Sequence, residues 1–312
     1  MSILFIGGAG FIGNKTLALL KKKNKKRKLA IYDNFSGSSF ATVSKGIDVI
    51  VGDTKSASSI SSALLTVKPD TIIFGAGPVG VAEDLKTAEE AYTKNVVNIL
   101  NLCKNLRESE AKPSKVILLS DACIYGEGTN LTETSPLKFD NYYAQSFDMA
   151  ESLLQLTCKR VGIGLLILRL PIVYGVRQEF GTDLVSFIIN CALDKVDFAV
   201  FGSNKTARDF VYIDELVEKL ATLIDSDVKG VLNLGGQHVS IGPLVDEIIK
   251  RTESKSQYKF GSPAGCEYKT ITLDYSLAKS LGISFDTKVS SVLDSIIKKT
   301  KEYKKNKKKF EL

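Results

Sequence analysis

Residues 3–13 read ILFIGGAGFIG and are followed by NKTLALL. An apolar run of this kind is typical of a buried strand, and the amphipathic segment after it is typical of a helix. Between them, Gly8, Gly10 and Gly13 satisfy the spacing GxGxxG, and Gly7, Gly10 and Gly13 satisfy GxxGxxG. Glycines permit a tight turn and let the backbone approach a pyrophosphate, which the N-terminus of the helix attracts. The stretch therefore predicts the first strand, turn and helix of a dinucleotide-binding sheet.

A carboxylate follows the second predicted strand, at the position where a dinucleotide-binding sheet contacts the ribose of its ligand. Asp33 follows the strand candidate 28–32 and lies 20 residues after Gly13. It is suited to accept hydrogen bonds from a ribose 2′-hydroxyl, and no arginine follows in DNFSGSS (33–39) to receive a 2′-phosphate. The sequence therefore favours NAD over NADP. The alternative is a glycine turn with an unrelated surface aspartate.

Over the first 175 residues, short β-rich runs alternate with amphipathic segments of helical length. The strand candidates are 3–6, 28–32, 47–51, 71–74, 115–120 and 164–170, and helix candidates are 85–106 and 143–160. This alternation implies βαβ crossovers, and near-continuous apolar strands are typical of parallel strands buried on both faces. The predicted fold class is α/β, with a doubly wound parallel sheet of the Rossmann type.

The pattern loosens after residue 175, which predicts a second, smaller part of the chain. We expect a Rossmann domain over 1–175, joined by a returning segment at about 208–236. A smaller, interleaved substrate-binding lobe is then expected from 176–207 and 237–312, with a basic tail at 298–312.

Composition excludes several classes of protein. Apolar residues make up 44% of the 312 residues, which is enough for a packed core. No apolar run approaches the ~18 residues of a membrane span, and glycines interrupt the pattern of a signal peptide at the N-terminus. The five scattered cysteines, without CxxC spacing, indicate a reducing cytoplasm and no structural metal. The sole histidine, His238, is expected to be an ordinary loop residue.

The net charge of +7 is unevenly distributed. The runs KKKNKKRK (21–28) and KKTKEYKKNKKK (298–309) each contribute +7, so the remainder of the chain carries −7. Such runs could contact nucleic acid or an acidic partner, and solvated ends of helices are the simpler interpretation. No aromatic residues interleave with the first run, so a nucleic-acid partner is not expected.

Several further blocks of sequence resemble one known family. They occur in the family's order and span nearly the whole chain: GGAGFIG, DNFS, GD (52–53), IYGE (124–127), LRLPIVYGVR (168–177), RDFVYIDEL (208–216) and VLNLGG (231–236). The chain resembles an extended short-chain dehydrogenase/reductase of the NAD-dependent nucleotide-sugar epimerase/dehydratase family, similar to UDP-galactose 4-epimerase. The resemblance implies tightly held NAD, a C-terminal nucleotide-sugar lobe, and a homodimer formed through helices 85–106 and 143–160.

The resemblance also implies which residues form the site. The cofactor contacts it implies are Gly7, Gly10, Phe11, Ile12, Gly13, Asp33, Asn34, Asp53, Thr54, Gly75, Ala76, Gly77, Tyr143 and Pro171. Asp53 would lie beside the adenine. Arg208 matches an arginine that holds the nucleotide diphosphate, for which a guanidinium is suited.

The catalytic pattern of the family is broken in this chain. Tyr143 matches the tyrosine of Tyr-x-x-x-Lys, but the lysine position is Phe147. The Ser or Thr position is Asp121, and Ser120 lies one residue earlier. An unperturbed tyrosine has a pKa near 10, so a nearby ammonium normally helps it to act as a base, and an ionised Asp121 would act in the opposite sense. The literal match YSLAK (275–279) is read as a coincidence.

Substrate positions depart from the family pattern as well. Ile172 stands where an asparagine is expected, and Pro263, before Gly265 and Cys266, stands where a second diphosphate arginine is expected. FGAG (74–77) replaces the family's segment after the fourth strand.

Two main hypotheses remain open. In the first, the chain is a divergent NAD-dependent enzyme that acts by hydride transfer on a nucleotide-sugar-like substrate. Tyr143 would then be the acid/base, assisted by Lys138 or replaced by Asp121, and this hypothesis is preferred. In the second, the chain is a catalytically silent NAD-binding scaffold or sensor subunit. A third, weaker hypothesis is nucleic-acid association through the lysine runs. The sequence names neither the sugar nor the reaction among epimerase, dehydratase, reductase and decarboxylase.

Overall fold

The computed structural model describes residues 1–77, 85–109, 112–139, 141–176, 183–261 and 270–310. The chain forms two compact units, each built from separate stretches of sequence. Unit 1 comprises Met1–Ile124, Leu137–Leu170 and Val217–Asn233, and unit 2 comprises Tyr125–Pro136, Pro171–Leu216 and Leu234–Leu312. Pro263, Gly265 and Cys266, whose roles the sequence raised, lie outside the described residues.

Unit 1 contains a seven-stranded sheet in the order β11-β7-β5-β4-β1-β2-β3, and all its strand pairs are parallel. The strands are β1 (Ser2–Ile6), β2 (Lys28–Asp33), β3 (Asp48–Val51), β4 (Thr71–Phe74), β5 (Lys115–Asp121), β7 (Gly164–Leu170) and β11 (Gly230–Asn233). From β1 the chain runs outward through β2 and β3, then returns to β4 on the other side of β1. The sheet is therefore doubly wound, as predicted, with its switch point between β1 and β4.

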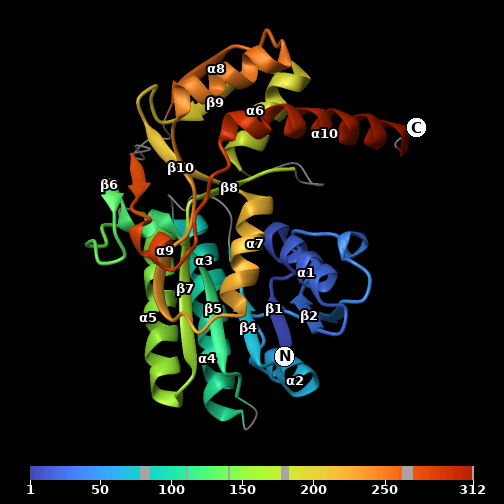
Figure 1. The fold of residues 1–312 in the computed structure, drawn as a ribbon, viewed down its shortest axis with the longest axis vertical. Coiled ribbons are helices and arrows are strands. Elements are labelled where there is room, and N and C mark those ends of the chain that lie inside the picture. Colours follow the sequence, from blue (N-terminus) through green and yellow to red (C-terminus); the bar gives the residue numbers. More distant parts are fainter. Residues whose placement is uncertain (78–84, 110–111, 140, 177–182, 262–269, 311–312) are drawn as a thin grey trace. The chain divides into compact units, whose positions relative to one another are not determined.

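Helices cover this sheet because its strands are apolar on both faces. The helices of this part of the chain are α1 (Phe11–Lys23), α2 (Ala57–Val67), α3 (Leu85–Tyr92), α4 (Asn98–Glu108), α5 (Tyr142–Val161) and α7 (Ile213–Ile224), whose residues from Val217 onward belong to unit 1. Apolar side chains of α2, α4 and α5 form one core cluster with Leu4 and Ile6 of β1. The alternate residues Ile3 and Phe5 are also buried, so both faces of the strand are covered. Figure 1 shows α4 and α5 running along the strands.

The expected helix 85–106 is interrupted in the structure. A π-helical stretch, Thr93–Val97, separates α3 from α4. Asn95, at its centre, is buried, and its Nδ2 donates a hydrogen bond to Ser146 Oγ of α5 at 2.9 Å. Short π-helical segments of this kind are frequent at functional sites.

Unit 2 is built on a second sheet, in the order β12-β10-β14-β6 with β8 also paired to β10. Its strands are β6 (Gly128–Leu131), β8 (Ile172–Tyr174), β10 (Ala207–Tyr212), β12 (Gln237–Ser240) and β14 (Ile271–Leu273), beside a two-stranded sheet of β9 (Phe198–Phe201) and β13 (Tyr258–Gly261). The helices α6 (Leu184–Asp194), α8 (Ile241–Thr252) and α10 (Val289–Phe310) pack their apolar faces into one core with β10, and α9 (Ser276–Ser280) is a short helix. No helix among the described residues is long and apolar enough to cross a membrane.

His238 is not the loop residue that the sequence indicated. It lies in β12, opposite Asp209 of β10, and its Nδ1 contacts the buried Asp209 carboxylate. The same carboxylate accepts hydrogen bonds from Leu273 N at 2.7 Å and from the Tyr275 hydroxyl at 2.6 Å. Burial and the Asp209 charge hold the pKa of Tyr275 far above its ordinary value. Asp209 therefore connects β10, β12 and β14 through one polar centre.

A buried ion pair joins the second half of the unit 1 sheet to α5. Arg169 of β7 donates to Glu151 of α5 from Nε at 3.1 Å and from Nη2 at 2.7 Å. The Ser120 hydroxyl of β5 donates a hydrogen bond to the same carboxylate at 2.5 Å. All three side chains are at least nine-tenths buried, and the two-pronged geometry satisfies both charges.

We predict that Arg169→Met lowers the stability of unit 1 by about 3–5 kcal/mol, because Glu151 is left as a buried charge without its cation. The expected fall in Tm is about 10 °C for a unit of this size. The triple variant S120A/E151L/R169M, which removes every member of the network, should recover most of the loss. Thermal unfolding followed by circular dichroism measures both, and an unchanged Tm for Arg169→Met would contradict the assignment.

Candidate active site

The turn after β1 requires glycine for steric reasons. Gly7 has φ +78°, and a Cβ atom added to it would lie 2.6 Å from Ala76 N in the loop after β4. Its own N–H donates to Tyr32 O of β2 at 2.8 Å, and Gly75 N donates to Ile6 O at 2.9 Å. Backbone from three strand ends therefore meets at Gly7, which leaves no room for a side chain.

The N-terminus of α1 is built to face an anion. Gly10 is the N-cap residue, and no side chain caps the helix there. Among the described residues, a Cβ atom added to Gly10 would meet Gly7 O alone, at 3.4 Å, whereas one added to Gly13 would lie 2.6 Å from Gly8 Cα. Gly13 thus permits close packing of the helix on the turn, and Gly10 keeps the space before the helix clear. Phe11, Ile12 and Gly13 form the first turn of α1, and their N–H groups stand at the positive end of the helix dipole. That end suits a pyrophosphate.

Acidic and polar residues gather at the ends of β2 and β3. Asp33 Oδ2 accepts a hydrogen bond from Ala9 N at 3.0 Å, and Oδ1 accepts from Phe35 N at 2.9 Å. Asn34 Nδ2 donates to Asp53 Oδ2 at 3.4 Å. Thr54 is buried, and its carbonyl accepts from Asn101 Nδ2 of α4 at 3.0 Å. Each carboxylate oxygen has two acceptor positions, so the Asp33 oxygens can still accept ribose hydroxyls.

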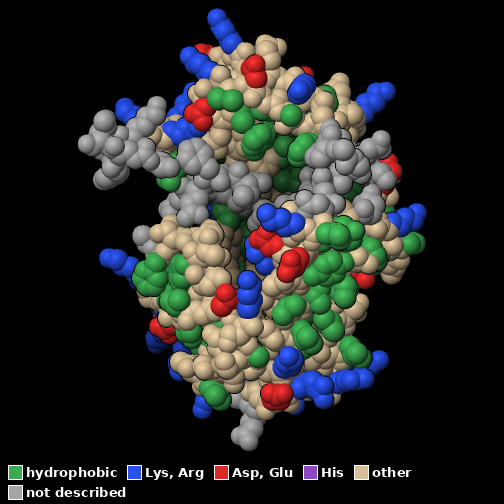
Figure 2. Space-filling view, turned by 180° about the vertical axis from the view of Figure 1, so that it is seen from behind, with side chains coloured by type: hydrophobic (Ala, Val, Ile, Leu, Met, Phe, Trp, Pro, Cys, Tyr) green, Lys and Arg blue, Asp and Glu red, His purple; other side chains and the backbone are tan. Residues whose placement is uncertain are grey.

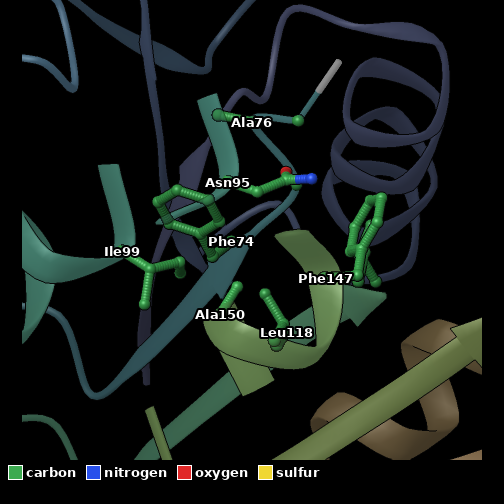
Figure 3. A pocket seen from close by; sticks show the side chains of 10 residues that line it. Phe74, Ala76, Asn95, Ile99, Leu118, Phe147 and Ala150 are labelled. Atoms are coloured by element: carbon green, nitrogen blue, oxygen red, sulfur yellow. The ribbon is translucent and has the colours of Figure 1, made fainter. Parts of the chain in front are cut away.

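On the other side of β1, the loop after β4 borders a small pocket within unit 1 (Figure 3). The residues that line it are Phe74, Gly75, Ala76, Gly77, Asn95, Ile99, Leu118, Leu119, Phe147 and Ala150. In this view the Asn95 amide lies between the rings of Phe74 and Phe147. A Cβ atom added to Gly77 would meet Asn95 Oδ1 at 3.1 Å and Phe147 Cζ at 3.7 Å. Phe147 therefore places an aromatic ring against the loop, where the resemblance implies an ammonium.

The two residues expected at the chemical centre are brought together. The Tyr143 hydroxyl donates a hydrogen bond to Asp121 Oδ2 at 3.3 Å, and Asp121 Oδ1 accepts from Cys123 N at 2.8 Å. Tyr143 lies in the first turn of α5, whose N-cap is Asn141, with its Oδ1 accepting from Ala144 N at 2.8 Å. The Phe147 ring stands nearly perpendicular to the Tyr143 ring, with centroids 5.1 Å apart.

Other predicted residues lie elsewhere. The Ser120 hydroxyl is directed to Glu151 in the buried network rather than to Tyr143. Lys138 lies at an exposed position. In unit 2, Pro171 packs against Gly235, where an added Cβ would lie 2.4 Å from Pro171 Cγ. Arg208 is half-buried on β10, in register with Ile271 of β14.

Sequence reasoning missed Asn95. Its amide donates to Ser146 Oγ, and Ser146 Oγ donates to the Tyr143 carbonyl at 2.7 Å. The amide therefore connects the π-helical stretch to the turn of α5 that carries Tyr143. An asparagine on the apolar stripe of the helix candidate 85–106 was the available signal, because a polar group buried there needs a partner.

The model of the NAD dependent epimerase/dehydratase family matches residues 3–241. The chain belongs to this family. A UDP-glucose 4-epimerase of Yersinia enterocolitica is 28% identical over 282 residues, which are 81% of this chain and 82% of that protein. A UDP-glucose 4-epimerase of Lactobacillus helveticus is 24% identical and covers 100% of this chain and 99% of its own length.

Solved structures of similar fold agree with this membership. The UDP-glucose 4-epimerase of Thermus thermophilus in complex with NAD has a TM-score of 0.87 at 21% identity, covering 96% of this chain and 98% of its own. UDP-glucuronic acid 4-epimerase of Bacillus cereus, in complex with UDP-glucuronic acid and NAD, has a TM-score of 0.84 at 26% identity over 96% and 100% of the two chains. The predicted family, its Rossmann fold and its dependence on NAD are thereby confirmed. The hypothesis of a silent scaffold subunit is not favoured by these relatives.

The family's cofactor fits the residues present. The clear space at Gly10 and the remaining acceptor positions of Asp33 suit a pyrophosphate and a ribose. In the site, Gly7, Gly10, Phe11, Ile12 and Gly13 would hold the pyrophosphate.

We predict that Gly10→Ala and Gly7→Ala fail in different ways. Gly10→Ala should leave Tm nearly unchanged, because its methyl meets one atom at van der Waals distance, yet weaken NAD binding at least about tenfold. Gly7→Ala should instead lower Tm by about 5 °C or more, because its φ and its overlap with Ala76 are both unfavourable. Gly37→Ala, where an added Cβ meets none of the described atoms within 4 Å, is the control for both. Calorimetric titration measures the NAD affinity of each variant, and thermal unfolding measures its Tm. Equal NAD affinities of Gly10→Ala and the parent protein would contradict the proposed position of the pyrophosphate.

Proposed function

We propose that the protein is an enzyme that transfers hydride between NAD and a nucleotide-sugar-like substrate, with Tyr143 as the acid/base. Family membership and the fit of the glycine turn support the cofactor half of this proposal. The observation that carries the catalytic half is the hydrogen bond from the Tyr143 hydroxyl to Asp121 Oδ2.

This pair can move a proton without forming a free phenolate. NAD, when bound, supplies the acceptor and donor of hydride. As hydride leaves a sugar carbon, the proton of the attached hydroxyl must go to a base. The Tyr143 oxygen can accept that proton while its own proton passes to Asp121, and the reverse transfer restores both groups. A lone tyrosine near pKa 10 would be mostly protonated at neutral pH, so a concerted transfer avoids the unfavourable ion.

Supporting residues hold this pair in place. Ser120 acts through Glu151, which with Arg169 fixes α5 against β5 and β7. The Asn95–Ser146 hydrogen bonds brace the turn that carries Tyr143. We assign these residues to positioning, because the hydrogen bonds described for them do not involve the Tyr143 hydroxyl.

We further propose that unit 1 is the NAD-binding domain and unit 2 the substrate-binding lobe. Asn34, Asp53 and Thr54 would then adjoin the adenosine, and Gly75, Ala76, Gly77 and Tyr143 the other half of the cofactor. Arg208 would hold the substrate diphosphate, since its side chain lies half-buried on a strand with a fork of donors.

A homodimer through α3, α4 and α5 is part of the same proposal. Large apolar side chains on these helices and the stretch between them are exposed: Leu85, Val97, Leu100, Tyr142, Met149 and Leu156. On the face seen in Figure 2, hydrophobic side chains of unit 1 gather at the surface. Exposed apolar side chains gathered on one face favour a protein partner. The free thiols of Cys103, Cys158 and Cys191 support a reducing, cytoplasmic location.

The proposed reaction predicts a signal at 340 nm. NAD-loaded protein mixed with UDP-, GDP- and dTDP-sugars should show reduced NAD with at least one of them. Tyr143→Phe should lower the rate by about 100-fold or more, because it removes the proton carrier and leaves the ring packed on Phe147. Tyr142→Phe, which alters the exposed neighbouring phenol, is the matched control. A rate that survives Tyr143→Phe would refute its role, and NAD binding without any signal across the panel would oppose the enzyme.

The proposed dimer predicts a change of mass. Leu156→Glu places a charge on an apolar side chain that is 50% exposed in α5, so it should convert the dimer to a monomer in light scattering after gel filtration. Leu65→Glu on α2, where Leu65 is 62% exposed, should leave the mass unchanged. A monomeric parent protein, or a dimer that Leu65→Glu alone disrupts, would contradict the surface chosen.

A further inference from the structure

A row of buried asparagines runs along α4 and the π-helical stretch before it. Asn95, Asn98, Asn101 and Asn105 are each at most 7% exposed, and a buried amide needs hydrogen-bond partners. Asn95, Asn101 and Asn105 each donate a hydrogen bond from Nδ2. Asn98 differs from them, because its Oδ1 is buried and has no hydrogen-bond partner among the described residues. The fold therefore holds one amide oxygen whose donor has to come from elsewhere.

The neighbouring amides show what this part of α4 faces. Asn105 Nδ2 donates to Ala57 O at 2.9 Å, and one turn earlier Asn101 Nδ2 donates to Thr54 O at 3.0 Å. A step toward the N-terminus of α4 is therefore a step toward the end of β3, which precedes Thr54 in the chain. Asn98 is three residues before Asn101, on the same side of the helix. Its side chain is thus directed to the residues that follow β3.

The residues next to Asn98 connect it to a second strand end. Asn95 and Ile99 line the small pocket that the Gly75–Gly77 loop borders, after β4 (Figure 3). Asn98 therefore lies between this loop and the turn at Asp53. Both follow strands of the parallel sheet, so they lie at its carboxyl edge, where a dinucleotide binds.

The adenine ring is the part of NAD that suits this position. With the pyrophosphate at α1 and the adenosine ribose at Asp33, the base continues past the end of β2 toward the end of β3, the next strand of the sheet. Pyrophosphate oxygens only accept hydrogen bonds and would repel the Asn98 oxygen. Adenine presents an amino donor beside a ring-nitrogen acceptor, which an asparagine amide matches with one acceptor and one donor.

We propose that Asn98 recognises the adenine of NAD, with its Oδ1 accepting a hydrogen bond from the adenine amino group. The inference rests on the proposed function for the position of the cofactor, and it extends that function by naming a residue that reads the base. The ligand then supplies the donor that the fold does not.

An amide held for a ligand and an amide held for the fold differ in their effect on stability. A buried acceptor without a partner destabilises the free protein, whereas an apolar side chain of similar shape carries no such penalty. Removing the Asn98 amide should therefore stabilise the free protein and weaken the complex with NAD. Removing a paired amide of the same helix should instead destabilise the free protein.

Asn98→Leu, of nearly the same size, tests both signs in the full-length protein. Without NAD its Tm should lie about 2 °C or more above that of the parent protein, and its affinity for NAD should be about tenfold lower. Thermal unfolding measures the first quantity and calorimetric titration the second. Asn105→Leu is the matched control, two turns further along, where the amide is paired. It should lower Tm and leave the NAD affinity close to that of the parent protein.

Two further variants separate the chemistry of the amide from its bulk. Asn98→Ala removes the amide without adding atoms and should lose NAD affinity to a similar extent. Asn98→Asp keeps an acceptor and removes the donor, and it is tested with deamino-NAD, in which a carbonyl oxygen replaces the adenine amino group. The parent amide can rotate to donate to that oxygen, whereas a carboxylate cannot. Asn98→Asp should therefore prefer NAD over deamino-NAD about tenfold more strongly than the parent protein does.

The outcomes distinguish this inference from the proposed function. A parent protein that does not bind NAD would remove the proposed function itself. Parent-like NAD affinity in both Asn98→Leu and Asn98→Ala would overturn the inference alone, because water would then suffice as the partner of the buried oxygen. An unchanged preference between NAD and deamino-NAD in Asn98→Asp would also overturn it. Thermal unfolding shows which variants fold, and the affinities of the Leu and Ala variants decide if Asn98→Asp does not.

Discussion

The close approach of α1 and the β4 loop to the end of β1 is the contact on which the nucleotide site depends. Gly13 lies against Gly8 and Gly7 lies against Ala76 so tightly that a single methyl group on either glycine would overlap backbone. Because α1 can come this close, the helix begins at the edge of the sheet beside Asp33. The Asp33 carboxylate accepts a hydrogen bond from Ala9 N, in the turn before the helix. The glycines therefore set the distance between layers as well as the path of the turn.

Local sequence was sufficient to predict the parts of the site that are made by local backbone. The glycine spacing, Asp33 after the second strand and Tyr143 at the start of α5 are each defined within one strand-turn-helix unit, so their positions follow from the motif and the strand order. Tyr143 and Asp121 could be paired because they align with one family pattern, and the structure places them in contact.

What the sequence could not supply are contacts between side chains far apart in the chain. The sequence suggested Ser120 as a catalytic residue. Its hydroxyl is instead hydrogen-bonded to Glu151, which is 31 residues away and is itself fixed by Arg169. Asn95 meets Ser146 across 51 residues, and His238 meets Asp209 only because β12 pairs with β10. Each of these polar groups obtains its partner from tertiary packing, which amphipathic periodicity does not encode.

The Glu151–Arg169 pair also bears on how such a site can change over generations. The buried bidentate pair can form at only one rotation and one axial position of α5. That constraint does not depend on which side chains stand at positions 143 and 147. We therefore expect substitutions at those two positions to alter the charge presented to a ligand while the Glu151–Arg169 pair still holds α5 in place. The fold can therefore keep the position of α5 during evolution while the side chains that α5 presents to the ligand change.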